Sequence, residues 1–170
     1  MNSETTTKTP IFTGIVVDDG SERVPIRNKK GEEIGEFYFR PTDIDIMDRW
    51  DKFTENFGDI VQPLGEVSIA PNGEAAEDSE LDREVLAEAK KRLFGACDEL
   101  FDGNMSEAFF GKMNPFSPVN GYFYCENALN SVMEYIGAQF DVEAKKIDKR
   151  VAKYTHGYKA RTGKHKDGRK

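Results

Sequence analysis

The sequence predicts a mainly helical α+β fold: an N-terminal antiparallel β-meander packed on a bundle of about three main helices, with a long C-terminal helix projecting from the bundle. Three observations support this prediction. Short apolar runs separated by turn-forming residues fill the first part of the chain. Apolar residues three and four positions apart dominate the rest. The last of these periodic segments continues beyond what a small domain can cover, which predicts the projection.

The length of 170 residues fits one domain with a substantial core. We divide the chain into a disordered N-terminus at residues 1–10, a single domain at 11–143, and a basic helical extension with a disordered tail at 144–170. No apolar run approaches the ~20 residues that span a bilayer, and the start lacks a signal-peptide pattern. Cys97 and Cys125 show no CxxC spacing, so we interpret both as small buried hydrophobic residues in a reducing cytoplasm.

The predicted β-meander occupies residues 11–40. Its strands are expected in IFTGIVV, ERVPIRN and EIGEFYFR, joined by turns at DDG and NKKG. Pro25 places the second strand at an edge or makes it irregular. A sheet of this size is too small to stand alone, so one of its faces must pack on the helices that follow.

The stretch PTDIDIMDRWDKF puts three aspartates within six positions, beginning at Asp43, which raises the question of a metal site. On a helical wheel the apolar residues of this segment fall on one side and the acids on the other. An EF-hand would need a glycine at the sixth loop position and a closing acid, and both are missing. We therefore interpret the cluster as the solvated start of a helix at residues 42–64, with Thr42 as its N-cap.

Two further helices complete the predicted bundle. An exposed acidic loop at residues 65–78 leads into a helix at 79–101, and Gly103 suits the C′ position after it. Ser106 is expected to cap a short helical turn. The last core helix occupies residues 118–143.

Phe109, Phe110 and Phe116 lie in the loop-rich stretch NMSEAFFGKMNPFSPVNG. Aromatic side chains in such a stretch have two interpretations. They mark a partner-binding surface, or they plug the end of a helical core, which is the more frequent case. The sequence leaves both open, and we keep the three residues as candidate partner-binding residues.

Charge is distributed unevenly along the chain. The formal net charge is −7, but residues 144–170 hold eleven Lys or Arg and two acids, a net charge of +9, which leaves −16 for the first 143 residues. Apolar residues keep their helical spacing from the core into this extension. They form what we call the C-terminal ridge: Ile147, Val151, Tyr154 and Tyr158. Basic residues flank it: Lys146, Lys149, Arg150 and Lys153.

The extension has three interpretations. It is a solvated tail that aids solubility, a nucleic-acid-binding segment whose cations neutralise phosphates while its tyrosines stack on bases, or a helix that docks on another subunit or on a long helical partner. The acidic body argues against nucleic acid, because it would repel a duplex. We favour docking, because the ridge keeps the phase of the core stripe and a solubility tail has no need of a ridge.

No pattern in the chain predicts catalysis. The glycines form no GxGxxG or P-loop motif, and the serines form no GxSxG motif. His156 and His165 lie in or beside the basic tail without metal-ligand spacing. We therefore expect a protein that is not an enzyme and that holds no metal or cofactor.

Three sequence segments follow one another in a characteristic order: GEFYFRPTDIDIMDRWDKF, LFGACDELFDGNMSEAFFGKMNPFS and GYFYCENALNSVMEYI. In this order they resemble the small tail assembly chaperones of long-tailed phages and prophages of Gram-positive bacteria, over about Ile34 to Tyr158. In that family an aromatic strand leads through a Pro-x-Asp turn, here Pro41 and Asp43, into a helix with an arginine, here Arg49. The resemblance implies a non-enzymatic protein of the host cytoplasm that binds the tape-measure protein, keeps that helical rod soluble, and helps tail-tube subunits to polymerise around it.

The resemblance and the residue pattern agree on a mechanism. An exposed apolar ridge would bind a long apolar rod reversibly, and the acidic body would keep the complex soluble. The same ridge would also serve self-association into a ring or spiral of copies. Three alternatives belong to other classes: a structural tail component, such as a connector or completion protein, a nucleic-acid-binding protein that acts through its basic tail, and a carboxylate enzyme, which would need a pocket with convergent acids.

Overall fold

The computed structural model describes the backbone of residues 13–66 and 79–162, and the side chains of 13–65 and 83–155. The predicted disordered N-terminus at 1–10, nearly all of the acidic loop, and the last eight residues of the tail lie outside this part. The elements in order are β1 (Glu22–Arg27), β2 (Glu33–Phe39), α1 (Ile46–Val61), a 3-10 helix η1 (Gln62–Glu66), α2 (Ser79–Phe101), α3 (Met105–Phe110), β3 (Pro118–Val119), β4 (Tyr122–Phe123) and α4 (Tyr124–Thr162).

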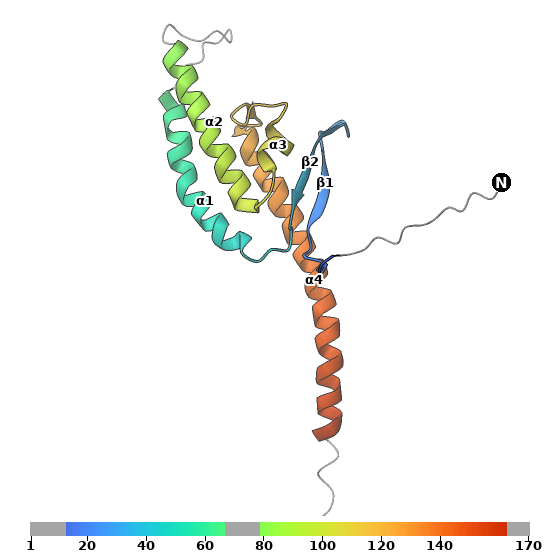
Figure 1. Ribbon diagram of the computed structural model, residues 1–170. Coiled ribbons are helices and arrows are strands. Elements are labelled where there is room, and N and C mark those ends of the chain that lie inside the picture. Colours follow the sequence, from blue (N-terminus) through green and yellow to red (C-terminus); the bar gives the residue numbers. More distant parts are fainter. Residues whose placement is uncertain (1–12, 67–78, 163–170) are drawn as a thin grey trace, which may run out of the picture.

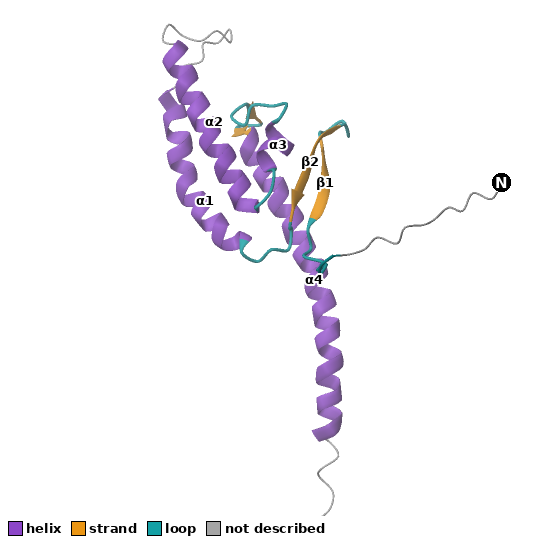
Figure 2. Ribbon diagram, in the orientation of Figure 1, coloured by secondary structure: helices purple, strands orange, loops and turns teal. Residues whose placement is uncertain are grey.

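The predicted fold class is confirmed. The protein is mainly helical, with an N-terminal antiparallel sheet and a long C-terminal helix (Figures 1 and 2). α1 packs on α2, α2 on α3, and α3 on β2. The core joins all of these layers, from Phe37 and Phe39 of the sheet to Leu93 of α2 and Leu129 of α4. Below the bundle, α4 continues alone (Figure 1).

The sheet is a two-stranded hairpin and not the predicted three-stranded meander. β1 and β2 pair antiparallel, with Val24 opposite Phe37. Residues 13–19 form no strand, although the sequence predicts one at 11–17. The turn that follows them explains the difference. Asp18 Oδ1 accepts the N–H of Gly20 at 3.0 Å, and Gly20 has a φ of +75°, so the chain enters β1 from outside the sheet.

The outer edge of β2 is held by a side chain instead of a strand. Asn104, in the connection between α2 and α3, accepts the N–H of Tyr38 through Oδ1 at 2.7 Å. Its Nδ2 donates to the carbonyl oxygen of Glu36 at 3.0 Å. One amide therefore satisfies two of the outward backbone groups of this edge, as a neighbouring strand would.

The end of α2 at Phe101 is predicted correctly, but the role given to Gly103 is wrong. The left-handed residue is Asp102, with a φ of 48°. The N–H groups of Asp102 and Gly103 donate to the carbonyl oxygens of Glu99 and Asp98, which is the Schellman pattern with Gly103 at C″. A Cβ on Gly103 would collide with the carbonyl oxygen of Tyr38, so this position needs glycine for the close approach of β2.

Ser106 is also not the N-cap of α3. That position is taken by Asn104, whose side chain is engaged by β2. Asp98 replaces it: its Oδ1 accepts the N–H of Ser106 at 2.7 Å and its Oδ2 accepts the Ser106 hydroxyl at 2.6 Å. A carboxylate from the preceding helix thus satisfies the first turn of α3.

Asp43 precedes α1, and its contacts link the end of β2, α1 and the end of α2. The helix begins at Ile46, later than the predicted residue 42, and Thr42 is not its N-cap. Asp43 Oδ2 accepts a hydrogen bond from Arg49 at 2.8 Å, and Arg49 Nε donates to the carbonyl oxygen of Leu100 at 2.7 Å. Arg40, just after β2, lies 3.4 Å from the same carboxylate. Among the described residues, no three His, Cys, Asp or Glu side chains group as a metal site.

The last helix starts at Tyr124, later than the predicted residue 118. Pro118 to Phe123 form the small hairpin β3–β4, whose turn places Asn120 and Gly121 at φ values of 56° and 83°. α4 then runs for 39 residues, about 58 Å, without a break at Gly137. The backbone is helical to Thr162, beyond the predicted start of disorder after Tyr158. No helix in the described part of the chain is long and apolar enough to cross a membrane.

Gly103→Ala should lower the free energy of unfolding by about 2 kcal/mol, because the added methyl group pushes β2 away from the connection between α2 and α3. Gly95→Ala is the matched control. Gly95 lies inside α2 with open space around it, so the change should stabilise the protein by about 1 kcal/mol through helix propensity. Urea unfolding followed by the fluorescence of the single tryptophan, Trp50, measures both. An unchanged midpoint for Gly103→Ala would contradict the close approach.

Burial alone raises the pKa of Asp43, but the hydrogen bonds from Arg49 and from the Asp45 N–H, together with the charges of Arg49 and Arg40, outweigh it and hold the pKa below its usual range. Asp43→Asn should therefore lower the free energy of unfolding by about 2 kcal/mol at pH 7.

Because folding lowers the pKa of Asp43, its contribution is fully present above the unfolded value of 3.8 and is lost as the pH falls through the lower pKa of the folded state. Unfolding curves of wild type and Asp43→Asn should converge well below pH 3.8. Asp51→Asn, an exposed acid of α1, should follow wild type throughout. A constant gap between wild type and Asp43→Asn at every pH would rule out this linkage.

Candidate partner-binding surface

The C-terminal ridge is exposed along the projecting part of α4. Ile147 and Val151 are 48% and 46% exposed, and Tyr154 is 73% exposed. Earlier members of the same helical stripe, such as Ile136 at 2% exposure, are buried in the bundle. The side chain of Tyr158 lies outside the described residues. The structure therefore brings the first three ridge residues together in solvent, in phase with the core.

Cations lie beside the ridge. The side chains of Lys146, Lys149, Arg150 and Lys153 are exposed. Positions 146, 150 and 153 are spaced four and three apart, so they follow one flank of the ridge along the helix. Lys149, two positions after Ile147, lies ~200° around the helix and therefore on the face opposite the ridge. Lys146 also pairs with Glu143 at 2.6 Å. The result is an apolar strip with a positively charged border.

Val142 shows that exposure alone does not define the ridge. It is 47% exposed, almost the same as Val151. Nine residues separate the two valines, and nine steps of ~100° place them on opposite faces of α4. The sequence pattern does not single out Val142, because it lies outside the stripe that Ile136, Ile147 and Val151 share.

The three candidate phenylalanines belong to the core. Phe109, Phe110 and Phe116 are 7%, 4% and 7% exposed. The ring of Phe109 meets Phe37 edge-on at 5.5 Å, and the ring of Phe110 stacks on Phe94 at 5.6 Å. This geometry favours the second of the two interpretations, in which the aromatic residues close the end of the helical core.

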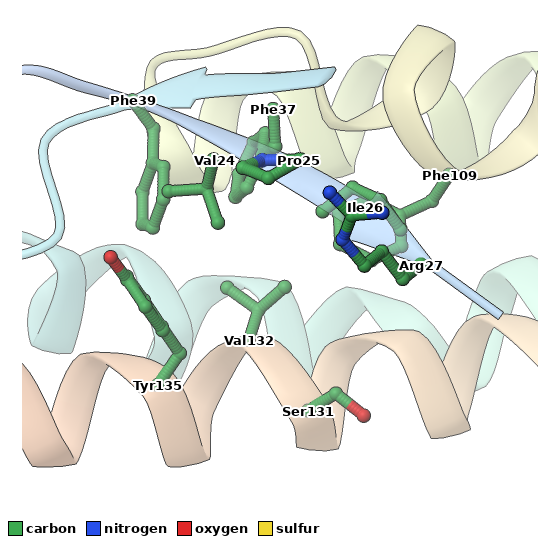
Figure 3. A pocket seen from close by; sticks show the side chains of 10 residues that line it. All are labelled: Val24, Pro25, Ile26, Arg27, Phe37, Phe39, Phe109, Ser131, Val132 and Tyr135. Carbon is green, nitrogen blue, oxygen red and sulfur yellow. The ribbon is translucent and has the colours of Figure 1, made fainter. Parts of the chain in front are cut away.

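A groove between the hairpin and α4 was not foreseen from the sequence (Figure 3). It has a volume of about 240 Å³, and its apolar lining includes Val24 and Ile26 of β1 and Val132 of α4. At one end Tyr135 donates its hydroxyl to Glu22 at 2.8 Å. Burial, this hydrogen bond and the charge of Glu22 raise the pKa of Tyr135 to about 12, so the phenol keeps its proton.

Both cysteines are buried, as predicted. Burial raises the pKa of Cys97, with smaller contributions from Cys125 and Asp98, and burial also raises that of Cys125, to about 12. The two residues are therefore neutral thiols at pH 7 and serve as core packing. Neither cysteine is therefore an activated nucleophile.

A scan against protein-family models and searches of curated proteins and of solved structures find no match for this chain. The resemblance to tail assembly chaperones therefore stays a prediction. The candidate surface rests on the geometry of α4 and on the charge and exposure of its side chains.

Phe109→Ala should lower the free energy of unfolding by about 4 kcal/mol, because it opens a cavity among Phe37, Phe110 and their neighbours. Tyr154→Ala removes an exposed aromatic ring from the ridge and should change the free energy of unfolding by less than about 0.5 kcal/mol. Urea titrations of the two variants separate packing from surface residues. A small effect of Phe109→Ala would mean that this ring is available to a partner after all.

Proposed function

We propose that this chain is a non-enzymatic phage tail assembly chaperone, which binds the tape-measure protein and assists tail-tube assembly, with the tail-tube protein as a further partner. The observation that carries the proposal is the exposed C-terminal ridge on a helix that leaves the bundle. Ile147 and Val151 are each about half exposed, although the same stripe is buried a few turns earlier. Apolar surface kept exposed in this way marks an interaction site.

The geometry of the ridge suits a helical partner. A long helical rod presents apolar side chains at spacings of three and four residues, and such rows pack into the grooves of a facing helix. The described side chains of the extension, residues 144–155, offer about 18 Å of contact. A helix that projects from its bundle also lets a partner lie alongside without meeting the body (Figure 1).

Charge supports both solubility and recognition. The first 143 residues carry a formal charge of −16, which keeps copies and their complexes apart in solution. The basic flank of the ridge would attract acidic residues of the partner helix and fix its orientation. Because such contacts are solvent-exposed, they add specificity and association rate more than affinity.

Val151→Ser should weaken capture of the co-expressed tape-measure protein about tenfold, since it removes roughly 1.5 kcal/mol of apolar burial. Val142→Ser makes the same chemical change at the same exposure on the opposite face and should leave capture unchanged. A chain ending at Phe140 should lose capture. Pull-downs at fixed protein concentration, with the bound fraction quantified against wild type, measure all three.

The other outcomes separate the alternatives. Equal capture by the full chain and the Phe140 truncation would move the contact to the body. If the full chain captures no tape-measure protein, the chaperone proposal fails. Binding of DNA or RNA that weakens steeply with salt and disappears with residues 144–170 would then favour the nucleic-acid alternative. Recovery of the chain in finished particles would favour a structural tail component.

A further inference from the structure

β1 has a free edge. Tyr38 and Glu36 of β2 direct their outward backbone groups to Asn104, away from β1. In an antiparallel pair, residues directly opposite each other point their backbone groups the same way, toward the partner strand or away from it. Arg23 lies opposite Tyr38, and Pro25 lies opposite Glu36. The outer edge of β1 therefore presents the N–H and carbonyl of Arg23 and the carbonyl of Pro25, and within the described residues nothing hydrogen-bonds to them.

This edge opens onto the groove above α4. Val24 and Ile26, which point inward from β1, are only partly buried. Figure 3 shows them across from Val132 and Tyr135 of α4, with the cavity of about 240 Å³ between. A strand added beside β1 would thus find backbone partners at its edge and apolar side chains under one of its faces.

The chain carries a segment suited to this place. Ile15, Val16 and Val17 are consecutive β-branched residues, a composition that favours strands. Their exposed fractions are 94%, 81% and 73%. Successive strand side chains alternate between faces, so Ile15 and Val17 would share one face and Val16 the other.

The segment does not reach the edge of its own β1. The N–H groups of Gly20 and Ser21 donate to the carboxylates of Asp18 and Asp19, each at 3.0 Å, and fix the turn before β1. Gly20 also packs near Thr42, with 3.4 Å between the Thr42 hydroxyl and the place of a Cβ.

We propose that residues 15–17 of one copy add as a strand to the free edge of β1 in a second copy, with Ile15 and Val17 in the groove and Val16 facing solvent. Reciprocal exchange between two copies would use both edges and both segments, which gives a closed dimer with two-fold symmetry. This interface is distinct from the C-terminal ridge and does not depend on the proposed chaperone function.

Cross-linking between differently tagged copies tests the proposal. One tagged chain carries Val16→Cys and the other Arg23→Cys, both exposed outer-face positions, and a short bis-maleimide reagent joins thiols that come close. The native Cys97 and Cys125 are buried and protonated, so they do not compete. We expect a cross-linked product that carries both tags. Adding Ile15→Asp and Val17→Asp to the first chain should abolish it.

The matched control replaces the Arg23→Cys chain by one with Asp51→Cys, an exposed position on α1. A doubly tagged product no stronger than in this control would overturn the proposal. So would a chain carrying both Val16→Cys and Arg23→Cys that cross-links only within itself. Light scattering gives a second readout: Ile15→Asp with Val17→Asp should halve the mass of wild type, and an unchanged mass would contradict the exchange.

Discussion

The close approach of β2 to the connection between α2 and α3 determines most of this architecture. Gly103 lets the backbone of Tyr38 come near, and Asn104 replaces a strand on that side. Gly35 makes a similar approach to the carbonyl of Ala108 in α3. Because a two-stranded hairpin is not stable alone, this docking is what gives the sheet a fixed place in the molecule. It buries Phe37 and Phe39 and leaves the other edge of the hairpin open.

The same docking determines which part of α4 is buried by other elements. α1, α2 and the hairpin surround its first half, so its stripe is buried as far as Ile136. α1 and α2 are 16 and 23 residues long, and a helix of 39 residues extends beyond them. The stripe nevertheless continues, with Ile147 half exposed. An apolar helical stripe that no other described element covers is the physical reason to expect a partner at this part of α4.

Periodic segments were predictable from sequence, and local exceptions were not. The bounds of α2 follow from its apolar spacing, and they match the structure from Ser79 to Phe101. The predicted start of α1 is too early because Asp43 binds Arg49 and Arg40 ahead of the helix. No local pattern shows that a distant carbonyl oxygen, that of Leu100, completes this site. The predicted start of α4 is too early because the Asn120-Gly121 turn closes the β3–β4 hairpin before the helix begins.

The surface features also fall into a part that the sequence predicts and a part that it does not. The C-terminal ridge could be predicted because exposure followed from helical phase and length. The groove at β1 could not, because it depends on how far the hairpin stands from α4, a distance set by contacts of β2 with α3. The strand predicted at residues 11–17 is an intermediate case. Ile15–Val17 have the β-branched composition of a strand, but the turn at Gly20 directs this segment away from β1 of its own chain, so it pairs with no strand among the described residues.

The two unpartnered surfaces are compatible with each other. The hydrogen bond from Tyr135 to Glu22 closes the groove on α4 about three turns before Ile147, so an added strand would leave the ridge free. A pair of copies joined through β1 would therefore carry two ridges. Two ridges on one body would bind the proposed long helical partner through a second contact that is effectively intramolecular, so modest affinity at each ridge would become strong binding overall. If instead each ridge acts singly, the contact is weaker and dissociation is faster, as reversible binding under the proposed function would require.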